Sequence, residues 1–234
     1  MPEARTIIVF PIYPDMTQLD FTGPHQVLTR LPDTRVVVAS ARGGTVVTGE
    51  GLAIADTVAM ASLPRCDVIC VPGGTGFTGA IEDSVYMAEL RRLAASATYV
   101  TSVCTGSLIL GATGMLRGKR AACHWAWRDL LAIYGAIADS GRVVRDGNIF
   151  TGGGVTAGID FALVLAAEIA GPETAQAIQL ALEYAPAPPF DAGRPETASP
   201  AVLALVEPRF AGLRATRVAA VQRAAARMDA GAQS

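Results

Sequence analysis

One cysteine stands where a strand-like segment of the chain meets a helix-like one, and this junction constrains the fold more than any other feature. Residues 99–103 carry the β-branched and aromatic side chains typical of a strand, and residues 106–110 carry an apolar pattern typical of a helix. The small residues Ser102 and Gly106, two positions either side of Cys104, suit a sharp turn, because neighbouring side chains must clear a strained backbone. The sequence therefore predicts a cysteine elbow whose thiol points outward.

The predicted position of Cys104 bears on its chemistry. At a helix N-terminus, backbone N–H groups and the helix dipole favour an anion and can lower a cysteine pKa from about 8.5 to roughly 3.5–7.5. We therefore predict that Cys104 is a nucleophilic thiolate. The alternative is a buried structural cysteine, which is the commoner role of a lone cysteine.

Strands and helices alternate along most of the chain. The patterns predict a hairpin over 45–54 at a sheet edge, and further strands at residues 6–10, 35–39, 67–71, 99–103, 120–125, 142–144 and 148–151. Helices are predicted after Gly23-Pro24, beyond Cys104, and over about 80–96, 126–134, 156–169 and 172–183. This alternation predicts an α/β, flavodoxin-like, doubly wound fold, in which helices cover both faces of a mainly parallel sheet.

We expect the α/β domain to span residues 1–184. Residues 185–200 are rich in proline and extended, and residues 201–229 predict an alanine- and arginine-rich helix. Residues 185–234 are therefore expected to form a strap and a C-terminal helix, packed on the same domain or on a dimer partner. The arginines of this helix are expected to be solvated or to make dimer contacts; they are Arg209, Arg214, Arg217, Arg223 and Arg227.

Three groups of chemical interest each follow a predicted strand. Asp20 comes after the first strand, Gly73-Gly74 after the strand at 67–71, and Cys104 after the strand at 99–103. Ligands of open α/β sheets bind outside the carboxyl ends of the strands, where the strand order reverses. The sequence thus predicts an active site that brings together an acid, backbone N–H donors and a nucleophile.

Composition narrows the classes of function. The 234 residues include 19 Lys and Arg against 21 Asp and Glu, a net charge of −2, so no global field attracts nucleic acid or an anionic membrane. The partner is expected to be a small molecule. Four cysteines without a CxxC pair favour a reducing cytoplasm, with Cys66, Cys70 and Cys123 as small core residues. No apolar run approaches the roughly 20 residues that a membrane-spanning helix needs.

Several motifs carry a family resemblance. Pro72-Gly73-Gly74, Val103-Cys104-Thr105-Gly106 and the segment 119–125 resemble the ThiJ/PfpI superfamily, whose fold is similar to that of class I glutamine amidotransferases. This likeness covers about residues 5–183. The segments 18–24, 102–107 and 182–190 are similar to those of the isocyanide hydratases and extend the match into the C-terminal region. AraC-type transcription regulators carry a domain with much the same Cys and His-Trp motifs.

The resemblance implies a reaction and the residues that perform it. It implies a lyase that hydrates isocyanides to N-substituted formamides through a cysteine thioimidate, without a cofactor or metal. Cys104 matches the nucleophile, and Asp20 matches the acid that replaces a glutamate of many relatives. Thr105 occupies the position at which peptidase-like relatives have histidine, which disfavours a Cys-His protease dyad and also glyoxalase- or deglycase-type chemistry. The superfamily is typically dimeric.

This chemistry places a demand on Asp20. To hydrogen-bond a thiolate, the Asp20 carboxyl must be protonated while Cys104 is ionised, which requires a raised pKa and couples the two titrations. The backbone N–H groups of Gly74, Thr75 and Thr105 are the expected donors to developing negative charge. The rival hypothesis is a non-catalytic small-molecule sensor, similar to the ligand-binding domain of AraC-type regulators.

Other candidates have plainer interpretations. His124 is a further candidate for the site, although a hydrogen-bonded structural role is favoured for it. His25, expected in the first turn of the first helix, is interpreted as a packing residue. Trp125 and Trp127 fit either a hydrophobic pocket or core packing. The glycines at 152–154 match a dinucleotide-binding pattern only weakly, and close helix packing explains them better.

Overall fold

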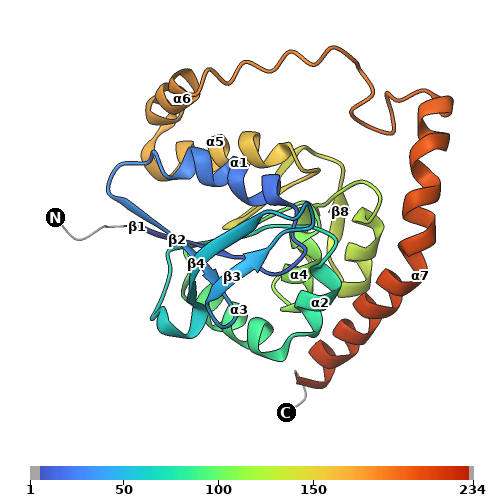
Figure 1. The fold of residues 1–234 in the computed structure, drawn as a ribbon, viewed down its shortest axis with the longest axis horizontal. Coiled ribbons are helices and arrows are strands. Elements are labelled where there is room, and N and C mark those ends of the chain that lie inside the picture. Colours follow the sequence, from blue (N-terminus) through green and yellow to red (C-terminus); the bar gives the residue numbers. More distant parts are fainter. Residues whose placement is uncertain (1–5, 232–234) are drawn as a thin grey trace.

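The computed structural model describes residues 6–231, and an eight-stranded sheet lies at its centre (Figure 1). The strand order is β3-β4-β2-β1-β5-β6-β10-β9. The strands are β1 (Thr6–Pro11), β2 (Thr34–Ser40), β3 (Gly44–Val47), β4 (Ala53–Ala59), β5 (Val68–Val71), β6 (Tyr99–Val103), β9 (Val143–Asp146) and β10 (Ile149–Gly152). Neighbours pair in parallel except at the two edges, where β3 and β9 run antiparallel to their partners. The predicted doubly wound, mainly parallel fold is confirmed.

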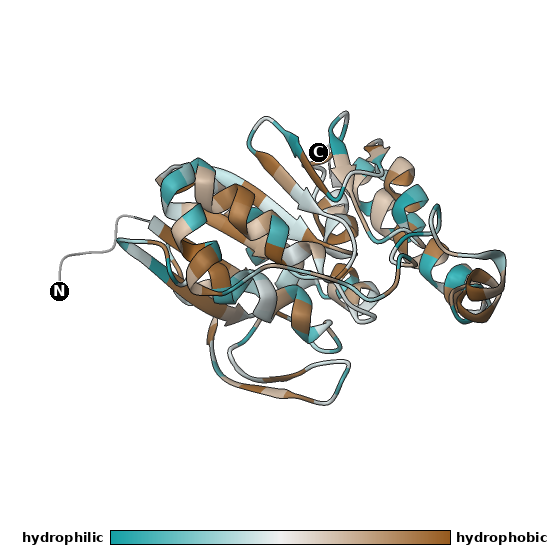
Figure 2. Ribbon diagram, turned by 90° about the horizontal axis from the view of Figure 1, so that it is seen from above, coloured by the Kyte–Doolittle hydropathy of each residue, from teal (hydrophilic) through white to brown (hydrophobic). Residues whose placement is uncertain are grey.

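Helices cover both faces of the sheet (Figures 1 and 2). One face carries α1 (Gln18–Leu28) and α5 (Ala157–Ala170), with α6 (Pro172–Ala181) packed on α5. The other face carries α2 (Phe77–Glu82), α3 (Ser84–Ser96) and α4 (Gly106–Ala112). Because both faces are covered, every residue of β5 and β10 is buried, as expected for central parallel strands.

The site-bearing helix α1 begins earlier than its sequence pattern predicts. We predicted a start at Gly23-Pro24, but α1 begins at Gln18 and contains Pro24. The N–H of its first residue is satisfied from outside the helix, since the Glu50 carboxylate in the β3–β4 hairpin accepts a 3.0 Å hydrogen bond from the Gln18 N–H. A contact between residues 32 positions apart thus sets the start of α1 and places Asp20 in its first turn.

Other boundaries also differ from the predictions. The predicted helix over 80–96 is two helices, separated at Asp83, whose carboxylate caps α3 by accepting from the N–H groups of Val85 and Tyr86. The predicted strand over 120–125 ends at Ala122, and the helix expected over 126–134 is the 3-10 helix η2 (Arg128–Tyr134). The short strand β7 (Arg120–Ala122) pairs in parallel with β8 (Ile137–Asp139), which was not predicted. A further 3-10 turn, η1, spans Met60–Ser62.

The strand order reverses next to β1. From β1 the chain continues to β2 on one side, and then crosses to β5 on the other side. The carboxyl ends of β1 and β5 therefore flank the crevice in which doubly wound proteins bind ligands. The segments that carry Asp20 and Gly73 leave β1 and β5 at this crevice, and the segment with Cys104 leaves the adjacent strand β6.

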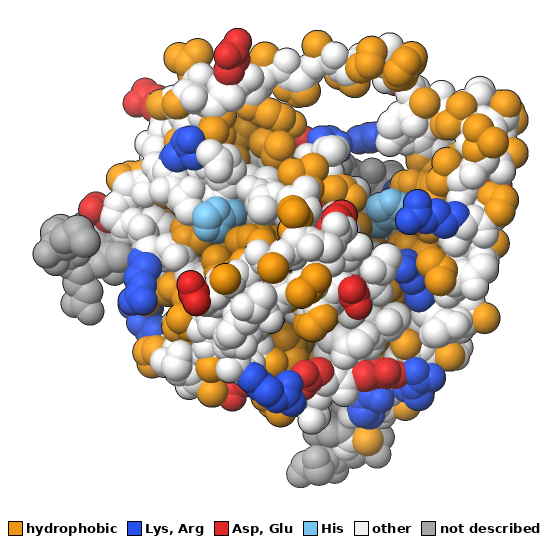
Figure 3. Space-filling model, viewed as in Figure 1, with side chains coloured by type: hydrophobic (Ala, Val, Ile, Leu, Met, Phe, Trp, Pro, Cys, Tyr) orange, Lys and Arg blue, Asp and Glu red, His pale blue; other side chains and the backbone are white. Residues whose placement is uncertain are grey.

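The C-terminal region differs from the rest of the molecule. Residues 182–199 form an extended strap that arches away from the body, and α7 (Pro200–Gly231) follows it (Figures 1 and 3). The second half of α7 packs against α2, α4 and η2, where Ala220, Val221 and Ala224 are buried. The strap and the first half of α7 leave hydrophobic side chains in solvent; Phe190 is 80% exposed and Leu205 is 82% exposed. Within residues 6–231, no helix is both long and apolar enough to span a bilayer.

Candidate active site

Cys104 occupies the turn between β6 and α4. Its backbone has a φ of 57°, in the left-handed region that costs a non-glycine residue about 1–3 kcal/mol. The turn is held by the Cys104 N–H, which donates to Gly152 at 3.0 Å. Gly106 permits the close packing of α4, because a Cβ at this position would lie 2.2 Å from the Val71 carbonyl oxygen. This is the strand–turn–helix geometry that the sequence predicts, although the Cys104 side chain is only 4% exposed.

Asp20 is a fully buried acid beside this turn. One carboxylate oxygen, Oδ2, accepts a 2.9 Å hydrogen bond from the Gly73 N–H, whereas Oδ1 is buried and has no hydrogen-bond partner within the described residues. Gly73 is essential to this approach: a Cβ there would lie 2.6 Å from Asp20 Oδ2 and 2.5 Å from the Thr105 nitrogen. The absence of a side chain at Gly73 lets the acid, the β5 loop and the cysteine turn meet.

Burial raises the pKa of Asp20 from 3.8 to about 7. The Gly73 hydrogen bond and the Cys104 thiol oppose this shift, and the negative charge of Glu50 adds to it. The predicted rise in the pKa of Asp20 is therefore confirmed. Its main physical cause is the loss of hydration around the carboxylate.

The predicted lowering of the Cys104 pKa is wrong. Burial, followed by the adjacent Asp20 carboxylate and then Cys123, raises the pKa of Cys104 well above its ordinary value, and the Thr105 N–H opposes the rise. The sequence argument counted the helix N-terminus and left out the cost of desolvating a thiolate. In this site the desolvation cost is the larger effect.

The two raised pKa values have one consequence for the pair. Two negative charges in a buried site repel each other, so above about pH 7 Asp20 and Cys104 together carry one negative charge and one proton. The resting form is a carboxylate next to a neutral thiol. A proton transfer from sulfur to oxygen converts it into a thiolate next to a carboxylic acid without changing the buried charge.

The three predicted backbone donors differ in their surroundings. The Thr105 N–H lies at the Cys104 sulfur and lowers its pKa. The Gly74 N–H is already used, because it donates to Thr105 Oγ1 at 2.9 Å, and the same hydroxyl donates back to the Gly74 carbonyl at 3.1 Å. Thr75 is exposed, and its hydroxyl donates to Asp15 at 3.3 Å. Of the three predicted donors, Thr105 is therefore the one whose N–H lowers the pKa of Cys104.

His124 is held as a neutral imidazole. Its Nδ1 accepts from the Ala126 N–H at 3.3 Å, and its ring packs 5.7 Å from Trp125 and 5.5 Å from Phe210. Burial and then the charge of Arg217 lower the pKa of His124 to about 4. At neutral pH it therefore carries no extra proton to donate.

The remaining predicted residues pack in the core or against it. His25 packs between Phe10 and Phe21, and because α1 begins at Gln18 it lies in the last turn of this helix rather than in the first. The predicted core cysteines Cys66, Cys70 and Cys123 are buried and unpaired, as expected.

Arg217 is the residue near the site that sequence reasoning missed. We expected all the arginines of α7 to be solvated or in dimer contacts, and this is wrong for Arg217, which is 7% exposed with its guanidinium carbon 4.1 Å from the Trp127 ring centroid. The sequence could have indicated this burial. Arg217 lies three and four positions before Ala220 and Val221, which are buried, and this spacing places all three on the same face of the helix.

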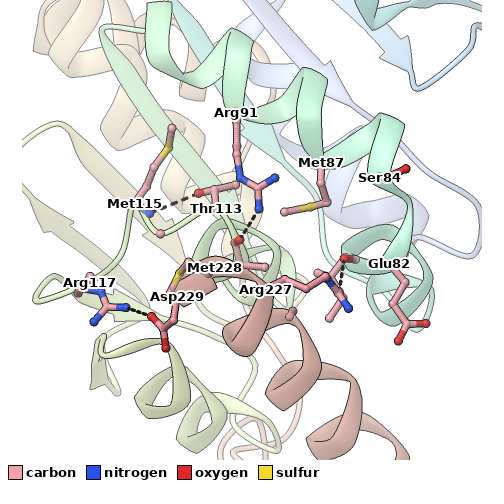
Figure 4. A pocket seen from close by; sticks show the side chains of 14 residues that line it. Glu82, Ser84, Met87, Arg91, Thr113, Met115, Arg117, Arg227, Met228 and Asp229 are labelled. Atoms are coloured by element: carbon pink, nitrogen blue, oxygen red, sulfur yellow. Dashed lines mark hydrogen bonds and ion pairs between the residues drawn. The ribbon is translucent and has the colours of Figure 1, made fainter. Parts of the chain in front are cut away.

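Two cavities are candidate substrate sites for Cys104 and Asp20. A cavity of about 1170 Å³ between α3, α4 and α7 does not include Cys104 or Asp20 (Figure 4). Its guanidinium groups are already engaged, since Arg91 donates to Ala112, Arg227 donates to Ile81 and Arg117 pairs with Asp229. It is therefore an unsuitable reaction site.

A smaller cavity of about 220 Å³ adjoins the cysteine turn. It is lined by Cys123, His124, the glycines 153–154 and the strap residues 193–196, among others. Because the Cys104 N–H binds Gly152, this cavity begins next to the turn. Within residues 6–231 no group of three or more His, Cys, Asp or Glu side chains is placed to hold a metal ion.

Comparison with known proteins identifies a family, and relatives that match nearly the whole chain. Residues 6–168 match the model of the DJ-1/PfpI family. An isonitrile hydratase from Pseudomonas putida is 52% identical over 222 residues, which cover 95% of this chain and 97% of the relative. A ThiJ/PfpI family protein from Pseudomonas syringae has a crystal structure that superposes with a TM-score of 0.87 at 39% identity, covering 94% of this chain and 90% of that one.

A regulator matches a smaller part of the chain. The HTH-type transcriptional regulator CdhR of Pseudomonas aeruginosa is 31% identical over 140 residues. The match covers 59% of this chain and 41% of the regulator. This likeness is a family relation within the α/β domain.

Proposed function

The chain belongs to the DJ-1/PfpI family, and we propose that within this family it catalyses the hydration of isocyanides to N-substituted formamides. The relative named isonitrile hydratase, a synonym of isocyanide hydratase, matches it along almost its whole length. The observation that carries the proposal is the buried pair of Asp20 and Cys104, which holds a nucleophile and one mobile proton together.

The first half of the proposed reaction forms a covalent intermediate. Asp20 takes the proton of the Cys104 thiol, and the resulting thiolate attacks the terminal carbon of the isocyanide, forming a carbon–sulfur bond. Asp20 then returns the proton to that carbon. The product is a thioimidate, R–N=CH–S–Cys104, in which the substrate has gained the elements of the thiol.

The second half releases the product. Asp20 accepts a proton from water as the water oxygen adds to the thioimidate carbon, and then passes this proton to the nitrogen, which gives R–NH–CH(OH)–S–Cys104. The carbon–sulfur bond then breaks as the hydroxyl proton moves to the sulfur, which yields R–NH–CHO and free Cys104. The net change is the addition of one water molecule to the isocyanide. Asp20 begins and ends each half as a carboxylate.

The surroundings of the pair support this division of roles. The Thr105 N–H lies at the sulfur, where it stabilises negative charge as the thiolate forms. Gly74 and Thr75 remain proposed contributors to that cradle, Gly74 only after its bond to the Thr105 hydroxyl opens. His124 is proposed to shape the site, because its pKa of about 4 leaves it neutral at pH 7. The cavity of about 220 Å³ has room for the organic group of a small isocyanide.

The decisive experiment is direct. The purified protein is mixed with one alkyl and one aryl isocyanide, and formamide formation is followed by ultraviolet absorbance, with product identity checked by mass spectrometry. We expect turnover of at least one substrate without added cofactor. No turnover of either, together with site-specific DNA binding in a shift assay, would favour the alternative of a sensor similar to AraC-type regulators.

We also propose that the protein is a cytoplasmic homodimer. The four unpaired cysteines support a reducing compartment. A second copy is the proposed cover for the hydrophobic side chains of the strap and the first half of α7, including Phe190 and Leu205. Light scattering after gel filtration measures the mass, and Leu205→Glu is expected to weaken the dimer. A monomeric mass for the unaltered protein would contradict this assembly.

A further inference from the structure

Arg217 is a buried cation on a helix that otherwise packs through small apolar residues. On α7 it extends the buried stripe of Ala220, Val221 and Ala224 towards the cysteine turn. Its guanidinium lies against two aromatic rings, 4.1 Å from the centroid of Trp127 and 5.4 Å from that of Phe77. Phe77 opens α2 directly after the β5 loop, so Arg217 reaches the edge of the sheet where the site lies.

No carboxylate pairs with Arg217 within the described part of the chain. The neighbouring arginines of α7 do form ion pairs, Arg214 with Asp129 and Arg223 with Glu82. Burying a cation costs several kcal/mol unless an anion compensates it, and contacts with aromatic faces recover only part of that cost. The position of Arg217 therefore calls for a negative charge that its own surroundings lack.

The Asp20–Cys104 pair supplies that charge. Burial lowers the pKa of Arg217, and the Cys104 sulfur is the group that opposes this shift. Arg217 also acts on His124, which lines the adjoining cavity. The contacts agree, since Arg217 packs on Phe77, whose N–H donates to the Gly74 carbonyl at 3.4 Å. The same carbonyl accepts from the hydroxyl of Thr105, the residue after Cys104. Arg217 therefore lies at the end of the sheet where the reacting sulfur lies.

The other titratable groups around the pair cannot serve as its counter-ion. They are acids or neutral groups: Tyr13 before α1, Glu50 in the hairpin, Cys70 in β5, and Cys123 and His124 after β7. Arg128 and Asp129 on η2 act on Cys123 with opposite signs. With one negative charge on the pair and one positive charge on Arg217, the buried site is electrically neutral.

We propose that Arg217 is the counter-ion of the Asp20–Cys104 pair, a positioning residue whose charge favours the form with the proton on Asp20 and the negative charge on sulfur. It thereby increases the fraction of reactive thiolate without touching the substrate. Because α7 lies beyond residues 6–168 of the family match, the C-terminal helix adds a charge that the matched α/β core does not supply. The inference rests on the proposed function for its role in turnover, but the effect on the thiol is independent of isocyanide chemistry.

The test compares Arg217→Gln and Arg217→Lys with the unaltered protein. The rate of iodoacetamide alkylation at Cys104, located by peptide mapping, is measured from pH 5 to 10, and kcat/KM for an isocyanide is measured in parallel. For Arg217→Gln we expect about tenfold slower alkylation near neutral pH and a midpoint about one pH unit higher, a change of about 1.4 kcal/mol. Arg217→Lys keeps the charge and is expected to stay closer to the unaltered protein.

Arg223→Gln is the matched control, since Arg223 lies on the same helix in an exposed ion pair with Glu82. It is expected to leave the alkylation profile unchanged. A folded Arg217→Gln protein with an unchanged midpoint overturns the proposal, whatever its activity. Failure of the unaltered protein to hydrate isocyanides, with the Arg217→Gln shift still present, would instead count against the proposed reaction and not against the counter-ion.

A second pair of variants covers a failure of Arg217→Gln to fold. In Asp20→Asn/Arg217→Gln both members of the buried charge arrangement are neutral. Its alkylation profile is compared with that of Asp20→Asn alone, and we expect the same upward shift of the midpoint. In urea denaturation, Arg217→Gln should cost less stability in the Asp20→Asn background than in the unaltered protein. Equal midpoints in this pair would also overturn the proposal.

Discussion

Cys104 and Cys123 follow consecutive strands of the chain, and only Cys104 has the surroundings of a nucleophile. Cys104 follows β6 and Cys123 follows β7; both side chains are buried, both have a backbone N–H at the sulfur, and burial raises the pKa of both thiols. Cys104 differs in its positive φ and in the carboxylate of Asp20 beside it. The comparison teaches that burial alone deactivates a thiol. A buried proton acceptor and a turn that presents the sulfur are what distinguish Cys104.

The largest expected effect comes from exchanging the two thiols for alanine one at a time. We expect Cys104→Ala to lose isocyanide hydration to the uncatalysed level while keeping its fold, because no other described group replaces the sulfur nucleophile. Cys123→Ala keeps the sulfur nucleophile and should retain most of kcat; any effect is expected in KM, because Cys123 lines the small cavity. Formamide formation and circular dichroism measure both. Turnover close to normal in Cys104→Ala would abolish the distinction between the two cysteines.

Replacing Asp20, the proton acceptor, tests whether this carboxylate accounts for the reactivity of Cys104. Asp20→Asn keeps the size of the side chain but cannot take or return a proton, so turnover is expected to fall by about 10²–10⁴-fold. Alkylation of Cys104 should persist, and its midpoint should move to lower pH, because the adjacent negative charge that raises the pKa of the thiol is gone. Iodoacetamide rates and formamide formation are measured on the same samples. Hydration at a near-normal rate would move the acid and base role to another group.

Because the Asp20 carboxyl is buried, the stability difference between Asp20→Asn and the unaltered protein is expected to depend on pH. The Asp20 pKa is raised from 3.8 to about 7 in the folded protein, so its proton stabilises the fold below pH 4, and this contribution is lost as the pH rises through 7. A rise of about three units corresponds to on the order of 4 kcal/mol. We expect Asp20→Asn to gain stability relative to the unaltered protein by up to that amount between pH 4 and pH 8. Urea denaturation at both values measures it, and a constant difference would show that the carboxyl is not perturbed.

The pH profile of turnover gives the smallest of these effects. Below pH about 7 the pair takes up a second proton, which leaves a carboxylic acid next to a neutral thiol and no acceptor for the thiol proton. We expect kcat/KM to fall about tenfold for each pH unit below this point and to be level above it. Cys66→Ala should show the same profile, since the groups that shift the pKa of Cys66 include neither Asp20 nor Cys104. A profile that is flat down to pH 5 would contradict the assignment of Asp20.

Much of the fold was readable from local patterns. Runs such as 67–71 and 99–103 are apolar and β-branched, so they predict buried strands, and their alternation with helical patterns predicts the parallel sheet. The identities of Ser102 and Gly106 around Cys104 predict the sharp turn at which the sulfur lies. These features depend on neighbours a few residues away, and the sequence therefore determines them directly.

The tertiary structure decided what those residues do. The start of α1 depends on Glu50 from a distant hairpin, and the use of the Gly74 N–H depends on the Thr105 hydroxyl 31 residues away. The pKa of Cys104 rises because surrounding segments exclude water, and Arg217 is buried because α7 packs against Trp127 and Phe77. Hydration and charge depend on everything packed around a group, and segments far apart in the chain supply that packing.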